Sequence, residues 1–312
     1  MATPSAVRGD EPRPTLRHRA ELLALLTFAA LVRLLGVRAG YLLARRAGDL
    51  LHLVDRRHRQ VARENLRRHP PTPDGAPLPE REVRRIAREV FRHLACSAVE
   101  VLHMAREIER RGVDDVVAGE HRERLHEALG RGKGVVLVTA HIGNWELVGA
   151  SARARGLELT TVYRPLDNPL LDRWMHRVRG RFGQELVPKQ GAVRALLRAL
   201  RAGRTVVLLV DQDARRRGLP VPFLGEPAST IPTPAELALR TGAAIIPAFT
   251  MRTGPGFRHL EWYDPEVDAT PGADHGADVE RITAELNRRV EAAVRRAPGQ
   301  WLWVHRRWKT QA

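Results

Sequence analysis

The spacing of apolar residues along the first third of the chain is that of helices. A leucine-rich helix is predicted over residues 22–53, with a break near Gly36 and Gly40. A second helix is predicted over residues 57–68 and ends at a run of prolines that cannot continue it. A third helix is predicted over residues 80–103, because its apolar side chains recur on one face.

From about residue 132 the pattern changes to short apolar runs separated by helical segments. Strands are predicted at 135–140, 157–163, 205–210 and 243–249, with a further candidate at 259–263. Helices are predicted to begin near Asn144, Asn168, Gly191 and Pro234, and a C-terminal helix spans residues 279–294. Continuous apolar strands that alternate with helices are typical of a sheet covered on both faces. The predicted fold class is therefore α/β, with a largely parallel central sheet flanked by helices.

These patterns divide the chain into three regions. Residues 1–18 are polar and proline-rich, and we expect them to form a disordered tail. Residues 19–110 are expected to form a helical N-terminal region. Residues 111–312 are expected to form one continuous α/β unit on which that helical region packs.

The leucine-rich N-terminal helix has the composition of a membrane-surface helix. Its longest uncharged run, residues 22–32, is 11 residues long, whereas a spanning helix needs about 20. Arg33 and Arg38 interrupt the apolar stretch, and basic residues among leucines suit a helix that lies in the interface with its guanidinium groups among the headgroups. The alternative is a core helix of a soluble domain. The length of the stretch and its arginine clusters favour membrane association.

The charge balance points to anionic partners. Lysine and arginine total 52 against 36 acidic residues, a formal net charge of +16. Such a balance suits nucleic acid, an acidic membrane surface, a phosphorylated ligand or an acidic carrier protein. Cys96 is the one cysteine, so a disulfide framework within one chain and a cysteine zinc site are excluded.

The end of the first predicted strand carries candidate chemistry in the sequence TAHIGNWE, residues 139–146. Ligands bind at the carboxyl ends of parallel strands. Asn144 is a good N-cap for the next helix, which puts Glu146 in its first turn. Gly143 permits a tight turn that lets His141 and Glu146 converge. A carboxylate that accepts one imidazole N–H raises the basicity of the other nitrogen, which can then take a proton from a hydroxyl.

Other catalytic histidine motifs do not fit this stretch. A zinc protease helix needs a second histidine four residues after the first, and a serine hydrolase needs a Gly-x-Ser-x-Gly elbow; the chain has neither here. On spacing alone, a histidine that follows a strand is most often structural. The wider sequence context is what favours a functional pair.

Four blocks in a fixed order supply that context: residues 130–150 around His141 and Glu146, 162–183 with Tyr-Arg-Pro and Asn-Pro, 208–247 with Asp-Gln-Asp and Pro-Phe-Leu-Gly, and 298–309, PGQWLWVHRRWK. Together they resemble the lysophospholipid acyltransferase superfamily. The similarity is greatest to the branch of bacterial lipid A biosynthesis (late-step, lauroyl or myristoyl) acyltransferases and phosphatidylinositol mannoside acyltransferases. It covers about residues 20 to 310.

This resemblance implies transfer of a fatty acyl group from a thioester of acyl carrier protein or coenzyme A to a lipid hydroxyl. His141 would be the base and Glu146 would orient it. No cofactor, metal or covalent acyl-enzyme is expected. The partners would be a membrane lipid acceptor, the acyl thioester and an anionic membrane surface, with no nucleic acid. The expected location is the cytoplasmic face of the inner membrane, held by a monotopic or single N-terminal hydrophobic helix.

Candidate substrate-binding residues lie in the same blocks. Guanidinium groups bind phosphate in bidentate fashion, and Arg164 and Arg179 are the arginines that we favour for this role. Asn144 and Asp211 complete the predicted substrate-binding set. Asp211 and Asp213 follow the strand at 205–210; a carboxylate pair can bind a metal, but we expect them to orient arginines or cap the loop.

Two points remain open from the sequence. The acceptor is expected to be a lipid A-type glycolipid or a related lysolipid, with a phosphatidylinositol mannoside or another specialised lipid as the alternative. A hypothesis of a different class is a basic nucleic-acid-binding protein, although aromatic residues are 5% of the chain and no recognition module is evident. Trp301 and Trp303 suit either a membrane-interface strip or core packing.

Overall fold

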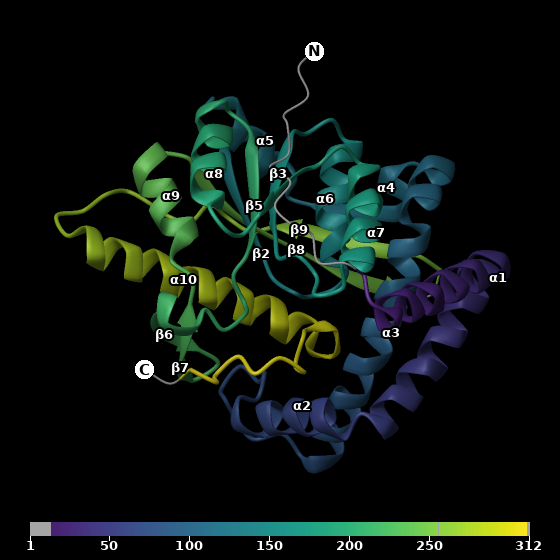
Figure 1. Ribbon diagram of the computed structural model, residues 1–312. Helices are drawn as coiled ribbons and strands as arrows, with labels where there is room; N and C mark the ends of the chain where they lie inside the picture. The colour runs from purple at the N-terminus through teal and green to yellow at the C-terminus, as the bar shows by residue number, and fades with distance from the viewer. Residues whose placement is uncertain (1–13, 255, 311–312) are drawn as a thin grey trace.

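The computed structural model describes residues 14–254 and 256–310, so the predicted tail falls mostly outside the described residues. The α-helices of this part are α1 (Leu16–Val54), α2 (Arg56–Arg68), α3 (Glu80–Arg111), α4 (Val113–Val116), α5 (Glu123–Gly130), α6 (Trp145–Ala154), α7 (Pro169–Gly180), α8 (Ala192–Arg201), α9 (Thr233–Thr241) and α10 (His275–Arg296). The strands are β1 (Val117–Glu120), β2 (Val135–Thr139), β3 (Leu159–Tyr163), β4 (Glu185–Pro188), β5 (Thr205–Leu209), β6 (Leu219–Phe223), β7 (Glu226–Thr230), β8 (Ala244–Gly254) and β9 (Arg258–Tyr263). Figure 1 shows helices on both sides of the central strands.

A seven-stranded sheet with the order β1-β9-β8-β2-β5-β3-β4 forms the centre of the molecule. Strands β8, β2, β5, β3 and β4 run parallel to one another, whereas β9 is antiparallel to β8 and β1 is parallel to β9. The predicted α/β class with a largely parallel sheet is therefore confirmed. The carboxyl ends of β2 and β5 lie side by side, with Thr139 paired to Leu209.

The central strand β2 is buried on both faces, which explains its continuous apolar sequence. Val136 and Val138 belong to the core cluster that includes residues of α8, α9 and α10. Val135 and Leu137 belong to the cluster on the other face, with residues of α5 and α6. Alternate side chains of one strand thus hold two helical layers onto the sheet.

The N-terminal helices pack against the sheet domain through α3. Helix α3 contacts α1 along much of its length and also contacts α2, α6 and the segment near Pro298. Within α1, Gly36 has non-helical dihedral angles (φ 72°, ψ 174°), so the predicted break falls there. Gly40 stays helical and buried, and a Cβ at that position would lie 3.1 Å from Val99 of α3.

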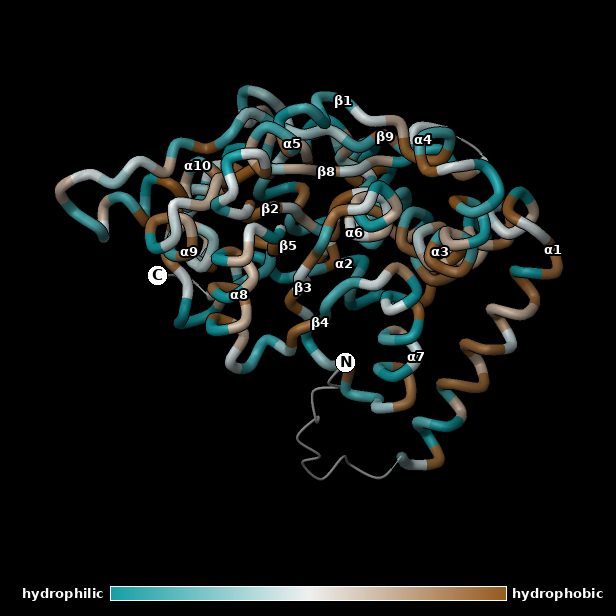
Figure 2. The backbone as a smooth tube through the Cα atoms, turned by 90° about the horizontal axis from the view of Figure 1, so that it is seen from above, coloured by the Kyte–Doolittle hydropathy of each residue, from teal (hydrophilic) through white to brown (hydrophobic). Residues whose placement is uncertain are grey.

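Helix α1 exposes a long apolar surface. Its leucines include Leu34, which is 85% exposed, and Leu23, which is 66% exposed. By length and composition α1 could cross a membrane: its most apolar 18-residue window has a mean hydropathy of 2.0, and 11% of that window is buried. Figure 2 shows its brown, hydrophobic turns along one edge of the molecule. A core helix of a soluble domain would be buried, so this alternative is wrong for most of α1.

Several elements differ from the sequence prediction. Helix α3 continues to Arg111 instead of ending at 103, and β3 begins at Leu159. The edge strands β1 and β4 and the hairpin β6–β7 were not predicted. The edge strands are short, with few apolar residues. The hairpin carries prolines such as Pro220, which suit it because it is a separate two-stranded sheet in which β6 keeps an open edge.

Substitution of Gly48 by alanine should weaken the contact between α1 and α3. The added Cβ would lie 2.6 Å from the Cα of Arg92, in backbone that cannot yield without shifting a helix. We expect the free energy of unfolding to fall by about 1–3 kcal/mol. The control is Gly130→Ala, where nothing lies within 4 Å of the new Cβ and a slight gain is expected. Thermal denaturation measures both variants, and equal melting temperatures would contradict the close approach.

Candidate active site

The turn between β2 and α6 is shaped by Gly143 and Asn144. Asn144 is the N-cap of α6, as predicted, and its side-chain oxygen accepts the Glu146 N–H at 3.2 Å. Gly143 has a φ of 55°, and a Cβ there would lie 1.9 Å from the carbonyl oxygen of Thr250. Both the positive φ and the close approach to Thr250 therefore require glycine at position 143. The turn presents the side chain of His141 at the carboxyl edge of the sheet.

Asp211 is the carboxylate that holds His141. It follows β5, the strand beside β2, and its Oδ1 lies 2.8 Å from His141 Nδ1. Its Oδ2 accepts the backbone N–H of His141 at 2.8 Å and the indole N–H of Trp301 at 2.8 Å. The side chain of Asp211 is 1% exposed and that of His141 is 19% exposed. A fully buried carboxylate thus fixes a histidine ring that is still open to solvent.

The environment of Asp211 favours its ionised form. Burial, the largest single influence, raises the pKa of this carboxyl, but the His141 imidazole and the hydrogen bonds from His141 and Trp301 outweigh burial, and the net pKa lies below its usual value. An ionised carboxylate has no proton to donate, so Nδ1 of His141 carries the shared hydrogen. The other ring nitrogen, Nε2, is left as the basic site.

Glu146 does not orient His141 as the sequence analysis expected. Both of its oxygens are bound by Arg179 of α7, with Arg179 Nε donating to Oε2 at 2.9 Å. The expected pairing fails because Glu146 lies in the first turn of α6, where it faces α7, whereas Nδ1 of His141 faces β5. Arg179 is likewise committed to Glu146 through two of its N–H groups, although it was expected to serve phosphate. The side chains of this pair are 12% and 21% exposed.

The remaining predicted residues are placed differently. Arg164 follows β3, as expected, but its side chain is 78% exposed and its Nη2 lies 3.9 Å from Oδ1 of Asp167. Asp213 caps its own loop, because Oδ1 accepts the Arg215 N–H and Oδ2 accepts the Thr310 hydroxyl. Within the described residues, no group of three or more histidine, cysteine, aspartate or glutamate side chains is arranged to hold a metal.

A second buried carboxylate, Glu100 of α3, forms hydrogen bonds that hold the turn between β2 and α6. Its Oε2 accepts the side-chain amide of Asn144 at 2.9 Å, and its Oε1 accepts the Tyr41 hydroxyl at 2.7 Å and the Arg252 Nε–H. Burial, the largest influence, opposes ionisation, but His259, Arg252 and the hydrogen bonds lower the pKa of Glu100 to about 2. The sequence analysis missed this residue, since nothing local marks a glutamate inside an amphipathic helix as buried.

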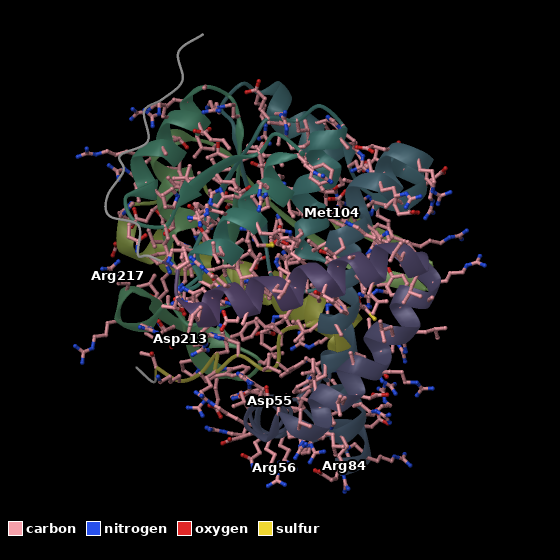
Figure 3. All side chains as sticks on the ribbon, turned by 45° about the vertical axis from the view of Figure 1, so that its right-hand side comes forward. Asp55, Arg56, Arg84, Met104, Asp213 and Arg217 are labelled. Atoms are coloured by element: carbon pink, nitrogen blue, oxygen red, sulfur yellow. The ribbon has the colours of Figure 1, made fainter. Side chains whose placement is uncertain are left out.

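An apolar cavity of about 260 Å³ lies between α1, α3 and α7. Its wall includes Ala105 and Met104 of α3, the latter labelled in Figure 3, and Trp174 of α7. The exposed arginines Arg33 and Arg177 also line it. Because α7 also carries Arg179, the same helix contributes to the cavity and to the ion pair with Glu146.

Comparisons with known proteins show the family to which the chain is similar. The family model for bacterial lipid A biosynthesis acyltransferases matches residues 12–310. A phosphatidylinositol mannoside acyltransferase of Mycobacterium tuberculosis (strain ATCC 25618 / H37Rv) is 32% identical over 225 residues, which are 71% of this chain and 66% of that protein. The lipid A biosynthesis palmitoleoyltransferase of Escherichia coli K12 is 30% identical over 196 residues, 62% of this chain and 61% of that protein. The matched segments thus span less than two thirds of these relatives.

Solved structures also match this chain, one of which is an acyltransferase. It is the 1-acyl-sn-glycerophosphate acyltransferase of Thermotoga maritima, with 10% sequence identity and a TM-score of 0.35 over 88% of this chain and 97% of that one.

The lowered pKa of Asp211 predicts an acid-dependent loss of stability. The unfolded carboxyl titrates near 3.9, and the folded one titrates lower, so its contribution is present above about pH 4 and is lost as the pH falls through the folded pKa. Asp211→Asn should lower the free energy of unfolding at pH 7 by about 1–3 kcal/mol and should lose less stability than the wild type as the pH falls below about 4. Urea denaturation across this range measures both effects. Parallel pH profiles would contradict the assignment.

Proposed function

The chain belongs to the bacterial lipid A biosynthesis acyltransferase family, and from that premise we propose that it is a membrane-associated O-acyltransferase. It moves a fatty acyl group from an acyl thioester to a hydroxyl of a glycolipid. The observation that carries this proposal is the pairing of a partly exposed His141 with a buried, ionised Asp211 at 2.8 Å. This pairing leaves Nε2 of His141 as a base directed toward solvent.

The transfer needs one base and no external reagent. Nε2 of His141 removes the proton of the acceptor hydroxyl while its oxygen attacks the thioester carbonyl. The new C–O bond forms, the C–S bond breaks, and the departing thiolate takes the proton back from the imidazolium. Asp211 stays ionised and stabilises the imidazolium in between. The N-terminus of α6 lies beside His141 and supplies positive potential for the oxyanion.

We assign a supporting part to the pair of Glu146 and Arg179. Glu146 occupies two N–H groups of Arg179, and a guanidinium has five. Arg179 can therefore be held in place and still offer donors to a phosphate group. Phosphate occurs in both phosphopantetheine thioesters and lipid headgroups, so this pair suits either substrate. Arg164, which is far more exposed, is the weaker candidate for that role.

The cavity between α1, α3 and α7 suits the fatty acyl chain. Its wall is mainly apolar, and the exposed Arg33 and Arg177 in that wall would suit an anionic group attached to the chain. Its proximity to the turn between β2 and α6 is supported by one core cluster that joins Leu147 of α6 with Val178 of α7 and with Phe182, which follows α7. Chain-length selection would then depend on how far this cavity extends into the core.

We place the protein at the cytoplasmic face of the inner membrane. The exposed leucines of α1 would enter the acyl region, and its arginines would remain among the headgroups. A surface position fits the break at Gly36, which divides the helix into two shorter segments. The acyl cavity adjoins α1, so a lipid would reach it from the membrane side.

The identities of the acyl donor and of the acceptor lipid are more specific proposals. Acyl carrier protein or coenzyme A would present the thioester, and we favour a lipid A-type glycolipid or a related lysolipid as the acceptor. A phosphatidylinositol mannoside is a second candidate, because relatives with that name are 32–33% identical to this chain. The nucleic-acid-binding hypothesis gains no support from the comparisons, which match acyltransferases, and in Figure 3 blue nitrogen tips are seen around the outline of the molecule.

Replacement of His141 by alanine should abolish acyl transfer and leave the fold intact. Loss of a general base removes about 10²–10⁴-fold in rate, and Asp211→Asn should lose a comparable factor because the ring is no longer oriented. Glu146→Ala should lose much of the rate but not all of it. The measurement is lipid mass spectrometry of a deletion strain that carries each variant.

The control for this experiment is His58→Ala, an exposed histidine of α2 with a side chain that is 49% exposed. It should restore the wild-type lipid profile. Full restoration by His141→Ala would overturn the mechanism. The lipid that loses an acyl chain in the deletion strain identifies the acceptor, and an unchanged lipid profile would count against a housekeeping lipid role.

Filling the cavity should shorten the preferred acyl chain. Ala105→Phe adds a ring at a partly exposed cavity position, so long acyl donors should lose rate by about tenfold relative to short ones. Ala105→Ser changes little volume and serves as the control. Competition between thioesters of different chain length provides the measurement. The same chain-length profile in both variants would exclude this cavity as the acyl site.

A further inference from the structure

The C-terminal segment, defined here as residues 298–309, contacts the catalytic turn directly. We propose that Trp301 of this segment is a positioning residue for the pair of His141 and Asp211, acting through its indole N–H. This inference rests on the proposed function, because it concerns the base of that reaction. Trp301 does not reach the reacting atoms; it acts by holding the carboxylate that holds the histidine.

Both oxygens of Asp211 are fixed by donors from different parts of the chain. Oδ1 receives the ring N–H of His141, and Oδ2 receives the backbone N–H of His141 and the Trp301 indole, each at 2.8 Å. Two of the three donors come from the residue that is to be oriented. Trp301 supplies the one that does not move with His141, so it sets the plane of the carboxylate relative to the sheet.

The backbone beside Trp301 is joined to the same turn. Ile142 and Trp301 form an antiparallel bridge, and the Gly143 N–H donates to the Gln300 carbonyl at 3.0 Å. The Gln300 side chain accepts the Arg252 N–H at 2.8 Å and donates to the Arg252 carbonyl at 3.0 Å. The residues that follow His141 are thus attached to the segment whose indole binds Asp211, and the two contacts reinforce each other.

Trp303, next to Trp301 in the structure, is a closely matched control for the loss of the Trp301 indole N–H. Trp301 and Trp303 are both buried, at 1% and 0% exposure, and their rings are 4.6 Å apart. The Trp303 indole N–H, however, donates to the carbonyl of Pro298 at 2.8 Å and has no contact with Asp211. Removing either N–H costs one hydrogen bond, but only the Trp301 bond is made to Asp211.

Other ionisable groups also face this pair. The C-terminal segment contributes His305 and Arg307, and the loop after β5 contributes Asp213. Two ion pairs border the turn, Glu146 with Arg179 on the α6 side and Glu100 with Arg252 on the α3 side. Burial is the largest influence on His305 and on Arg307, where it lowers the pKa of each. The Trp301 indole bonds to none of these groups, so its removal changes the donors on Asp211 and leaves the charges in place.

Loss of the Trp301 N–H should shift the pH dependence of the reaction in one definite direction. An Asp211 carboxylate with one fewer hydrogen bond keeps more negative charge available to the His141 ring, which stabilises the protonated imidazole. The base then remains protonated to a higher pH, so the acidic limb of the pH profile moves upward. A carboxylate that is free to rotate also holds the ring less well, which lowers kcat while substrate binding stays the same.

The test compares Trp301→Phe with Trp303→Phe in the full chain. For Trp301→Phe we expect the acidic midpoint of the kcat/KM profile to rise by roughly half to one pH unit, kcat to fall by about tenfold, and KM to stay within about twofold. Trp303→Phe should leave the midpoint at the wild-type value. Equal midpoints in the two variants would overturn the proposal.

Two further measurements keep this test decisive. Titration of ¹⁵N-labelled histidine rings by NMR, with His141 assigned from His141→Ala, follows the same midpoint without any turnover, so the Trp301 contact can be judged even if the proposed acyl transfer is wrong. If Trp301→Phe does not fold, benzothienylalanine at position 301 replaces only the indole N–H by sulfur. An unchanged His141 titration in that protein would refute the positioning role.

Discussion

The burial of the Asp211 carboxylate is the constraint on which the site depends. A buried charge is tolerated only when its hydrogen-bonding capacity is satisfied. Asp211 meets this requirement with donors from the turn after β2 and from the C-terminal segment, while it is itself carried by the end of β5. Three segments that are distant in sequence must therefore come together before the carboxylate is stable. The same contacts leave one nitrogen of His141 available as a base.

The second buried carboxylate extends this arrangement to the N-terminal helices. Glu100 of α3 binds Asn144 of the turn between β2 and α6, Tyr41 of α1 and Arg252 of β8. Through it, the helix that exposes leucines and the turn that presents His141 share one hydrogen-bond network. The helical region is thus a structural part of the site and also carries the exposed apolar surface of α1. The family match likewise includes this helical region and continues to residue 310.

Local patterns predicted much of the fold. The long helices, the buried strands and the break at Gly36 all depend on residues a few positions apart, as does the cap at Asn144. The edge strands β1 and β4 and the β6–β7 hairpin escaped prediction, because they are short or rich in proline and gain their stability from pairing with distant partners. The position of His141 at the carboxyl edge of the sheet also followed from the sequence alone.

What the sequence by itself determined was the kind of chemistry: a histidine at a strand end, carboxylates nearby and arginines in the matching blocks. Only the tertiary structure decided which carboxylate serves the histidine. Asp211 lies 70 residues from His141 and reaches it because β5 is the neighbour of β2, whereas Glu146, five positions away, is turned by α6 toward Arg179. Strand order and helix direction set the partners of a charged group, and both arise from packing across the whole chain, which no local spacing can specify.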